Sequence, residues 1–182
     1  LYKFGMPMGM FSMLDIAGID IGVLARKNIP TESFDERAFR IHEALVASGS
    51  KGQKTNAGFY CYNGKEKTLN PEVEALTQKY AEEYGIKRRK ITPKEIEERC
   101  LFSLINEGFK IVEEGIAIRA SDVDVVYTSA FGFPRYKGGP LHYAEHLGLD
   151  YILKRINKFA KVHGNRWWTP SSLLVSLVRE NK

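Results

Sequence analysis

The sequence predicts an almost entirely α-helical protein built from two tandem copies of one helical unit. Apolar residues recur at helical spacing through most of the 182 residues, Pro and Gly mark helix starts and ends, and several short motifs occur twice. The composition, 43% apolar and 27% charged, is that of a folded globular chain. This length suits one ordinary domain or two small ones.

The first helices of the chain are short and separated by glycine. A helix that begins at Met10 is expected to end at Gly18, and Asp20 is expected to cap the next helix. A third helix is predicted by an apolar stripe at i, i+4, i+7 and i+11, which consists of Phe34, Ala38, Ile41 and Leu45.

A loop and a brief extended segment follow the third predicted helix. Gly, Asn and Thr make residues 51–58 loop-like, and residues 59–62 are apolar and aromatic enough for a short strand. The next helix is expected to start at Asn70-Pro71, because Asn caps well and Pro is tolerated at the first helical position. Gly85 is expected to end it.

The strongest helix start in the sequence is Thr92-Pro93-Lys94-Glu95, a capping box with Pro at the first helical position. Two apolar stripes extend this helix to about Ile118 and predict burial on most of its sides. We expect a solvent-facing polar strip along it, made of Glu95, Arg99, Ser103, Asn106, Lys110 and Glu113.

Further helices are predicted to the end of the chain. Ser121 or Asp122 caps a short turn, and a Gly/Pro-rich loop covers residues 131–140. Helices are expected over residues 141–146 and 150–162, and a last one is expected to be capped by Thr169-Pro170.

The internal repeat sets the domain organisation. Residues 1–64 form the first copy, residues 65–91 a linker with a helix, and residues 92–182 the second copy. We expect the copies to pack on each other about a pseudo-twofold axis, because each has apolar helix faces too broad to bury alone. The matched strings are Phe4-Gly5-Met6-Pro7 with Phe131-Gly132-Phe133-Pro134, Gly18-Ile19-Asp20-Ile21 with Gly148-Leu149-Asp150-Tyr151, and Leu45-Val46 with Leu177-Val178.

Composition and motifs argue against several functional classes. The net charge of +5 is spread along the chain. We interpret the one basic run, Lys87–Lys90, as a solvent-exposed connection between two helices and not as a nucleic-acid-binding surface. Cys61 and Cys100 form no disulfide or zinc framework. No apolar stretch is long enough for a membrane span, and no signal peptide opens the chain, so we expect a soluble protein.

No motif for nucleotide binding or nucleophilic catalysis occurs. The sequence has neither GxGxxG, GxxxxGK[ST] nor GxSxG. His142 and His146 fit the HxxEH spacing of a zinc site, but the chain offers no suitable third ligand downstream, so we assign them to a structural helix. Asp122 and Asp124 are interpreted as helix caps.

Three strings of the sequence carry a family resemblance. GMPMGMFSMLDIAGIDIG from Gly5, GQKTNAGFYCY from Gly52 and GFPRYKGGPLHYAEHLGLD from Gly132 resemble the C-terminal helical domains of 3-hydroxyacyl-CoA dehydrogenases. The match covers essentially the whole chain. Two copies in one polypeptide are similar to the multifunctional β-oxidation enzymes of peroxisomes and bacteria.

The resemblance implies a dehydrogenase that oxidises an L-3-hydroxyacyl-CoA with NAD, with its His–Glu dyad and its NAD in a Rossmann domain upstream of Leu1. No catalytic residue is therefore expected in this chain, and alone it should be inactive. The substrate-binding residues that the resemblance implies lie near the acyl-CoA cleft or pack on the Rossmann domain; they are Met6, Pro7, Met8, Gly9, Lys54 and Thr55. The second copy, whose loop contains the additional Arg135-Tyr136-Lys137, is expected to have no functioning site.

The expected role is the C-terminal, cleft-forming part of such a dehydrogenase, in a peroxisome or a bacterial cytoplasm. Its expected partners are an acyl-CoA and the upstream Rossmann domain, and as a fragment it is a candidate for homodimerisation. Because the chain starts at Leu1 within a motif, we interpret it as part of a longer polypeptide. Two alternatives are a non-catalytic helical scaffold and the C-terminal half of another Rossmann dehydrogenase.

Overall fold

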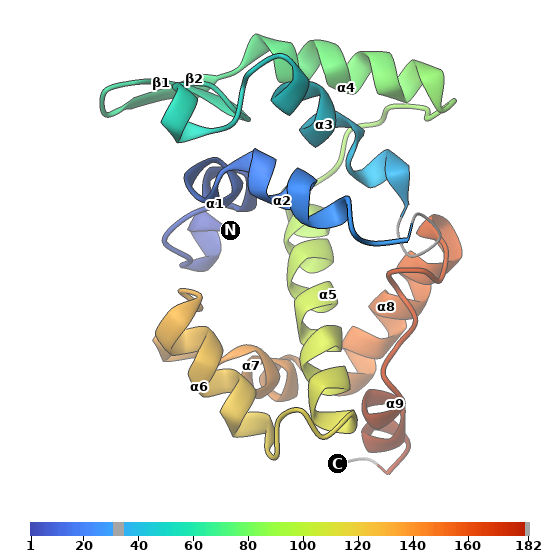
Figure 1. The fold of residues 1–182 in the computed structure, drawn as a ribbon. Coiled ribbons are helices and arrows are strands. Elements are labelled where there is room, and N and C mark those ends of the chain that lie inside the picture. The colour runs from blue at the N-terminus through green and yellow to red at the C-terminus, as the bar shows by residue number, and fades with distance from the viewer. Residues whose placement is uncertain (31–34, 181–182) are drawn as a thin grey trace. The chain divides into compact units, whose positions relative to one another are not determined.

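The computed structural model describes residues 1–30 and 35–180 and is mainly helical (Figure 1). These residues form two compact units. One unit comprises Met8–Lys90, and the other comprises Leu1–Pro7 together with Ile91–Lys182. Helices dominate both units, so the predicted all-α class is confirmed.

The unit Met8–Lys90 is built around α3, which packs against α2 and α4. Its small apolar core centres on Ile19, Leu45 and Phe59. The elements of this unit are α1 (Met10–Ala17), α2 (Ile19–Arg26), the 3-10 turn η3 (Glu36–Ala38), α3 (Arg40–Ala47), the 3-10 turn η4 (Gln53–Thr55), β1 (Tyr60–Asn63), β2 (Glu66–Leu69) and α4 (Pro71–Glu83).

Helix ends in this unit follow the predicted caps in most places. Gly18 ends α1, and the Asn70 side chain accepts a hydrogen bond from the backbone N–H of Glu72 at the start of α4. The prediction for Asp20 was wrong, because α2 begins directly after Gly18 and Asp20 lies in its first turn. Phe34 lies outside the described residues.

Two features of this unit differ from the sequence prediction. The third helix begins only at Arg40, because residues Glu36–Ala38 form a 3-10 turn. The extended segment is half of an antiparallel hairpin, in which Tyr60 pairs with Leu69. The partner strand β2 is exposed along its whole length, so it carries no apolar alternation that would reveal it.

The second unit surrounds the long helix α5. Figure 1 shows α6 and α7 on one side of α5 and α8 and α9 on the other. Leu101, Ile105 and Phe109 of α5 lie at the centre of the apolar core. The elements of this unit are the 3-10 turn η1 (Tyr2–Phe4), α5 (Pro93–Glu113), α6 (Ala120–Ala130), the 3-10 turn η5 (Arg135–Lys137), α7 (Pro140–Leu147), α8 (Leu149–His163) and α9 (Ser172–Arg179).

Three expectations for this unit need correction. Helix α5 ends at Glu113 and does not reach Ile118, because the chain turns at Gly115 with a φ of 70°. Asn106 is 2% exposed and does not face solvent. Its amide donates to the carbonyl of Thr169 and accepts from the N–H of Ser171, each at 2.9 Å. Ser171 caps α9 in place of Thr169.

The internal repeat is visible in the backbone. Helices α1 and α7 each have eight residues, as do α3 and α9. Gly18 after α1 has φ and ψ of 94° and 116°, and Gly148 after α7 has 93° and 116°. Only glycine adopts this conformation readily, so both copies use the same abrupt turn between two helices.

Candidate functional site

The six substrate-binding residues expected from the sequence fall into different units. Met6 and Pro7 belong to the unit that contains α5, whereas Met8, Gly9, Lys54 and Thr55 belong to the unit that contains α3. Met6 packs against the apolar core of its unit. A Cβ built on Gly132 would lie 2.6 Å from Cγ of Pro7, so Pro7 is also closely packed.

The loop that carries Lys54 is bonded to helix α2. The Lys54 ammonium lies 2.8 Å from Oδ2 of Asp20, and its hydrogen bond holds the pKa of that carboxyl below the ordinary value. The Thr55 hydroxyl accepts a hydrogen bond from the N–H of Lys51 and lies 3.1 Å from the carbonyl oxygen of Gly52. Half of the Lys54 side chain stays exposed, so its charge remains accessible to an anionic ligand.

Asp15 is the buried anchor of the same loop, and sequence reasoning missed it. This residue of α1 is 0% exposed and accepts hydrogen bonds from the N–H groups of Phe59 and Tyr60 and from the Tyr62 hydroxyl, at 2.8, 3.0 and 2.8 Å. A Cβ at Gly58 would collide with the Asp15 carboxylate. The available signal was a single charged residue in a helix whose other residues are apolar apart from Ser12.

Helices α1 and α2 carry apolar side chains that the rest of their own unit leaves exposed. In the other copy, the matching helix α7 packs against α5 and α6, and Leu141 and Ala144 are buried. An apolar face of this kind marks an interaction surface. Its exposed residues are Met10, Phe11, Met13, Ile16, Ile21 and Leu24.

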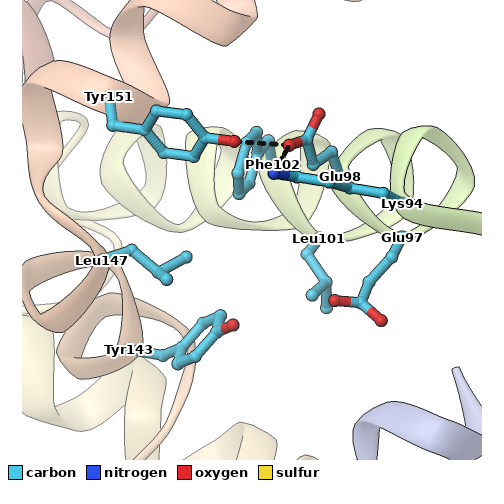
Figure 2. Close-up of a pocket in the computed structure, with 8 residues that line it drawn as sticks. All are labelled: Lys94, Glu97, Glu98, Leu101, Phe102, Tyr143, Leu147 and Tyr151. Carbon is cyan, nitrogen blue, oxygen red and sulfur yellow. Dashed lines mark hydrogen bonds and ion pairs between the residues drawn. The ribbon is translucent and has the colours of Figure 1, made fainter.

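A cavity of about 370 Å³ lies in the unit that contains α5 (Figure 2). Tyr143 and Leu147 of α7 face Leu101 of α5 across it, and Lys94 and Glu97 lie toward the start of α5 (Figure 2). The lining is apolar along the helices and charged at one end, a composition common in small-molecule sites.

A buried ion pair borders this cavity. Glu98 is 6% exposed and accepts hydrogen bonds from the Tyr151 hydroxyl at 2.5 Å and from Nε of Arg155 at 2.8 Å. The hydrogen bond to Glu98 raises the pKa of the Tyr151 phenol. Because both oxygens of Glu98 have donors, the cluster joins α8 to α5 and provides no free base.

The carboxylates of α6 cap helices, but the short turn predicted to be capped by Ser121 or Asp122 was wrong, because α6 is an 11-residue helix whose N-cap is Arg119. Asp122 accepts from the N–H of Arg119 at 3.0 Å at the start of α6. Asp124 accepts from the N–H groups of Leu141 and His142, at 2.7 and 3.1 Å, and so caps α7. Within residues 1–30 and 35–180, no group of three His, Cys, Asp or Glu side chains is arranged to hold a metal ion.

No helix in the described part of the chain combines the length and the apolar character needed to cross a membrane. NAD is the cofactor implied by the sequence resemblance. The chain has no Gly-rich phosphate-binding motif of the kind that holds the pyrophosphate of NAD.

Comparison with protein families settles the family. A family model described as 3-hydroxyacyl-CoA dehydrogenase, C-terminal domain, matches residues 1–62 and 96–182. The chain belongs to this family. The match leaves out residues 63–95, which contain β2 and α4.

Curated relatives of this chain are large multifunctional proteins. The peroxisomal bifunctional enzymes of Danio rerio and Homo sapiens are each 38% identical over 174 residues, which cover 87% of this chain and 24% of either relative. The Arabidopsis thaliana peroxisomal fatty acid beta-oxidation multifunctional protein AIM1 is 35% identical over 179 residues, 94% of this chain and 24% of that protein. The chain thus spans about a quarter of the length of these relatives.

A solved structure shows the same fold. The dehydrogenase part of multifunctional enzyme 1 from C. elegans superposes with a TM-score of 0.72 at 24% identity, over 96% of this chain and 40% of that one. The helical arrangement described above is therefore the fold of a known dehydrogenase segment.

Proposed function

We propose that this chain is the C-terminal helical part of an NAD-dependent L-3-hydroxyacyl-CoA dehydrogenase of fatty-acid β-oxidation, within a multifunctional enzyme. The observation that carries the proposal is the match of the family model to residues 1–62 and 96–182. The names of the relatives, which specify peroxisomal bifunctional and multifunctional β-oxidation proteins, support it.

The role proposed for these residues is structural support and substrate contact. NAD, bound by an upstream Rossmann domain, would supply the hydride acceptor. The exposed apolar side chains of α1 and α2 form the surface proposed to meet the rest of the dehydrogenase. Lys54, whose side chain is half exposed and whose ammonium is paired with Asp20, is proposed to contact the anionic CoA moiety at the edge of the cleft.

Dehydrogenase activity tests the proposed function directly. NADH oxidation by acetoacetyl-CoA is measured with this 182-residue chain and with the same protein extended upstream by the length of a Rossmann domain. We expect activity only in the longer protein, because the proposed catalytic base and NAD site are upstream. A longer protein that binds NADH but does not turn over acetoacetyl-CoA would contradict the proposal.

A variant at Lys54 tests the proposed substrate contact. In the extended protein, Lys54→Ala should raise the KM for acetoacetyl-CoA about two- to fivefold, the range expected for one exposed ionic contact. Lys54→Arg keeps the charge and should restore most of the affinity. The matched control is Lys65→Ala, at the exposed turn of the hairpin, which should leave KM unchanged. Equal KM values for Lys54→Ala and the unsubstituted protein would refute the contact.

The relatives' names also support a peroxisomal location for the parent protein. Microscopy of the tagged parent protein against a peroxisomal marker tests this location. Diffuse fluorescence with no overlap would contradict it.

A further inference from the structure

Residues Leu1–Pro7 form a small ordered strap in the unit that contains α5. The N–H groups of Phe4, Gly5 and Met6 all approach the carbonyl of Leu1, at 3.0, 3.2 and 3.3 Å. The strap therefore has a turn of its own. A segment that is already folded loses less conformational entropy when it docks.

The strap docks through Phe4, which is only 4% exposed. Its ring meets the rings of Phe133 and Tyr143 edge to face, with centroids 5.4 and 5.2 Å apart. The Lys137 ammonium lies 4.8 Å from the centre of the Phe4 ring. The Tyr136 hydroxyl donates to the Phe4 carbonyl at 3.2 Å, so both the side chain and the main chain of Phe4 are held.

The strap and the loop beneath it are repeat equivalents that pack reciprocally. A Cβ built on Gly5 would lie 3.0 Å from Cγ of Pro134, and one built on Gly132 would lie 2.6 Å from Cγ of Pro7. Each glycine of one copy thus makes room for the proline of the other. This mutual exchange of contacts is what a twofold relation between the two loops requires.

The surroundings of these loops break that symmetry. Tyr136 and Lys137 belong to the turn η5, which is present only in the second copy. Phe131 is the repeat counterpart of Phe4, but it is 58% exposed. One copy therefore contributes the anchoring ring, and the other copy contributes the residues that enclose it.

We propose that η5, together with Phe133 and Tyr143, is a peptide-binding clamp whose ligand is the Phe-Gly-Met-Pro strap of this chain. The additional residues of the second copy form a receptor for the loop of the first copy. The clamp selects an aromatic side chain followed by glycine, because the ring fills the aromatic site and a Cβ at Gly5 would lie only 2.8 Å from the Tyr136 hydroxyl, at a φ of 112° that favours glycine.

Amide exchange in the full 182-residue chain tests the clamp without unfolding it. Tyr136→Phe removes only the hydroxyl that donates to the Phe4 carbonyl, and Lys137→Met removes only the cation above the ring. Each variant should speed exchange at Phe4, Gly5 and Met6 about two- to tenfold, from the usual strength of one hydrogen bond or one cation–π contact.

The matched control for amide exchange is Phe131→Ala, at the exposed repeat counterpart of Phe4, which should leave exchange in the strap unchanged. Unchanged exchange in both clamp variants would overturn the proposal. Equal acceleration by the control would overturn it as well.

Peptide binding provides a second readout. A labelled peptide of sequence LYKFGMP should bind saturably to full-length Phe4→Ala, whose own strap has lost its anchor. It should bind unsubstituted protein at least tenfold more weakly, because a tethered strap competes at millimolar effective concentration. Adding Tyr136→Phe and Lys137→Met to Phe4→Ala should abolish binding. Equal binding of the peptide to all three proteins would overturn the proposal. If Phe4→Ala does not fold, the amide-exchange measurement tests the proposal instead.

Discussion

Asp15→Asn is expected to destabilise the unit Met8–Lys90 strongly, because Asp15 accepts three hydrogen bonds in a fully buried position. Asn keeps one acceptor oxygen for Phe59 but places an amide N–H group against the N–H of Tyr60. The Tyr62 hydroxyl can rotate and accept from the new amide. One buried donor is then left without a partner, and the other bonds lose their charged acceptor.

The size of the effect follows from these losses. A buried donor without a partner costs about 1–3 kcal/mol, and hydrogen bonds to a charged group are stronger than neutral ones by about 1 kcal/mol. We therefore expect the free energy of unfolding to fall by about 3 kcal/mol in Asp15→Asn. Tyr62→Phe removes one donor and should lower the free energy of unfolding by about 1 kcal/mol.

Urea denaturation followed by circular dichroism measures the free energy of unfolding, and amide exchange at Phe59 and Tyr60 locates the effect. The matched control is Glu145→Gln, at the repeat position equivalent to Asp15 but exposed on α7. It should change the stability by less than about 0.5 kcal/mol. If Asp15→Asn is as stable as the unsubstituted chain, or if both variants lose the same stability, the assigned role of Asp15 is refuted.

Two further variants probe the carboxylates of α5. Glu98→Gln should lower the free energy of unfolding by about 3 kcal/mol, because it leaves Arg155 without its buried partner. The same variant should lower the pKa of Tyr151 toward its ordinary value, which phenolate absorbance measures. An unchanged Tyr151 titration would contradict the hydrogen bond to Glu98. The Ser171 hydroxyl lowers the pKa of Glu113 in the folded protein. Ionised Glu113 therefore stabilises the folded state at a pH above its ordinary pKa, and this stabilisation is lost as the pH falls through the pKa that Glu113 has in the folded protein. Glu113→Gln should therefore weaken the decrease in the free energy of unfolding at acid pH, as measured by denaturation curves at several pH values. An unchanged pH dependence would refute the role of the hydrogen bond between Ser171 and Glu113.

The starts of α4 and α5 were predictable because the capping residue lies next to a proline at the first helical position. Thr92 and Asn70 bind N–H groups two or three residues away, so the interaction is complete within one turn and readable from the sequence. Gly18 ends α1 for the same local reason. The wrong predictions, Asp20 and Thr169, were residues of suitable chemistry that each lie two positions from the true cap.

The candidate site was less predictable than the fold, because its contacts join distant parts of the chain. Asp15 binds Phe59, 44 residues away, and Glu98 binds Arg155, 57 residues away. Asn106 fits the polar strip of α5 by spacing, but α9 and the segment before it cover that face and bury its amide. Periodicity identifies which residues share a helix face, but it does not say what packs on that face.

The sequence by itself determined the helical class, most helix starts, the duplication and the family, because periodicity, capping and motif order are properties of the linear chain. Only the tertiary structure decided that Leu1–Pro7 packs with the second copy and that Phe4 is enclosed while its counterpart Phe131 is exposed. The two phenylalanines occupy matching motifs, so no local rule separates them. Burial depends on which surfaces meet in three dimensions, and that is set by the packing of segments more than a hundred residues apart.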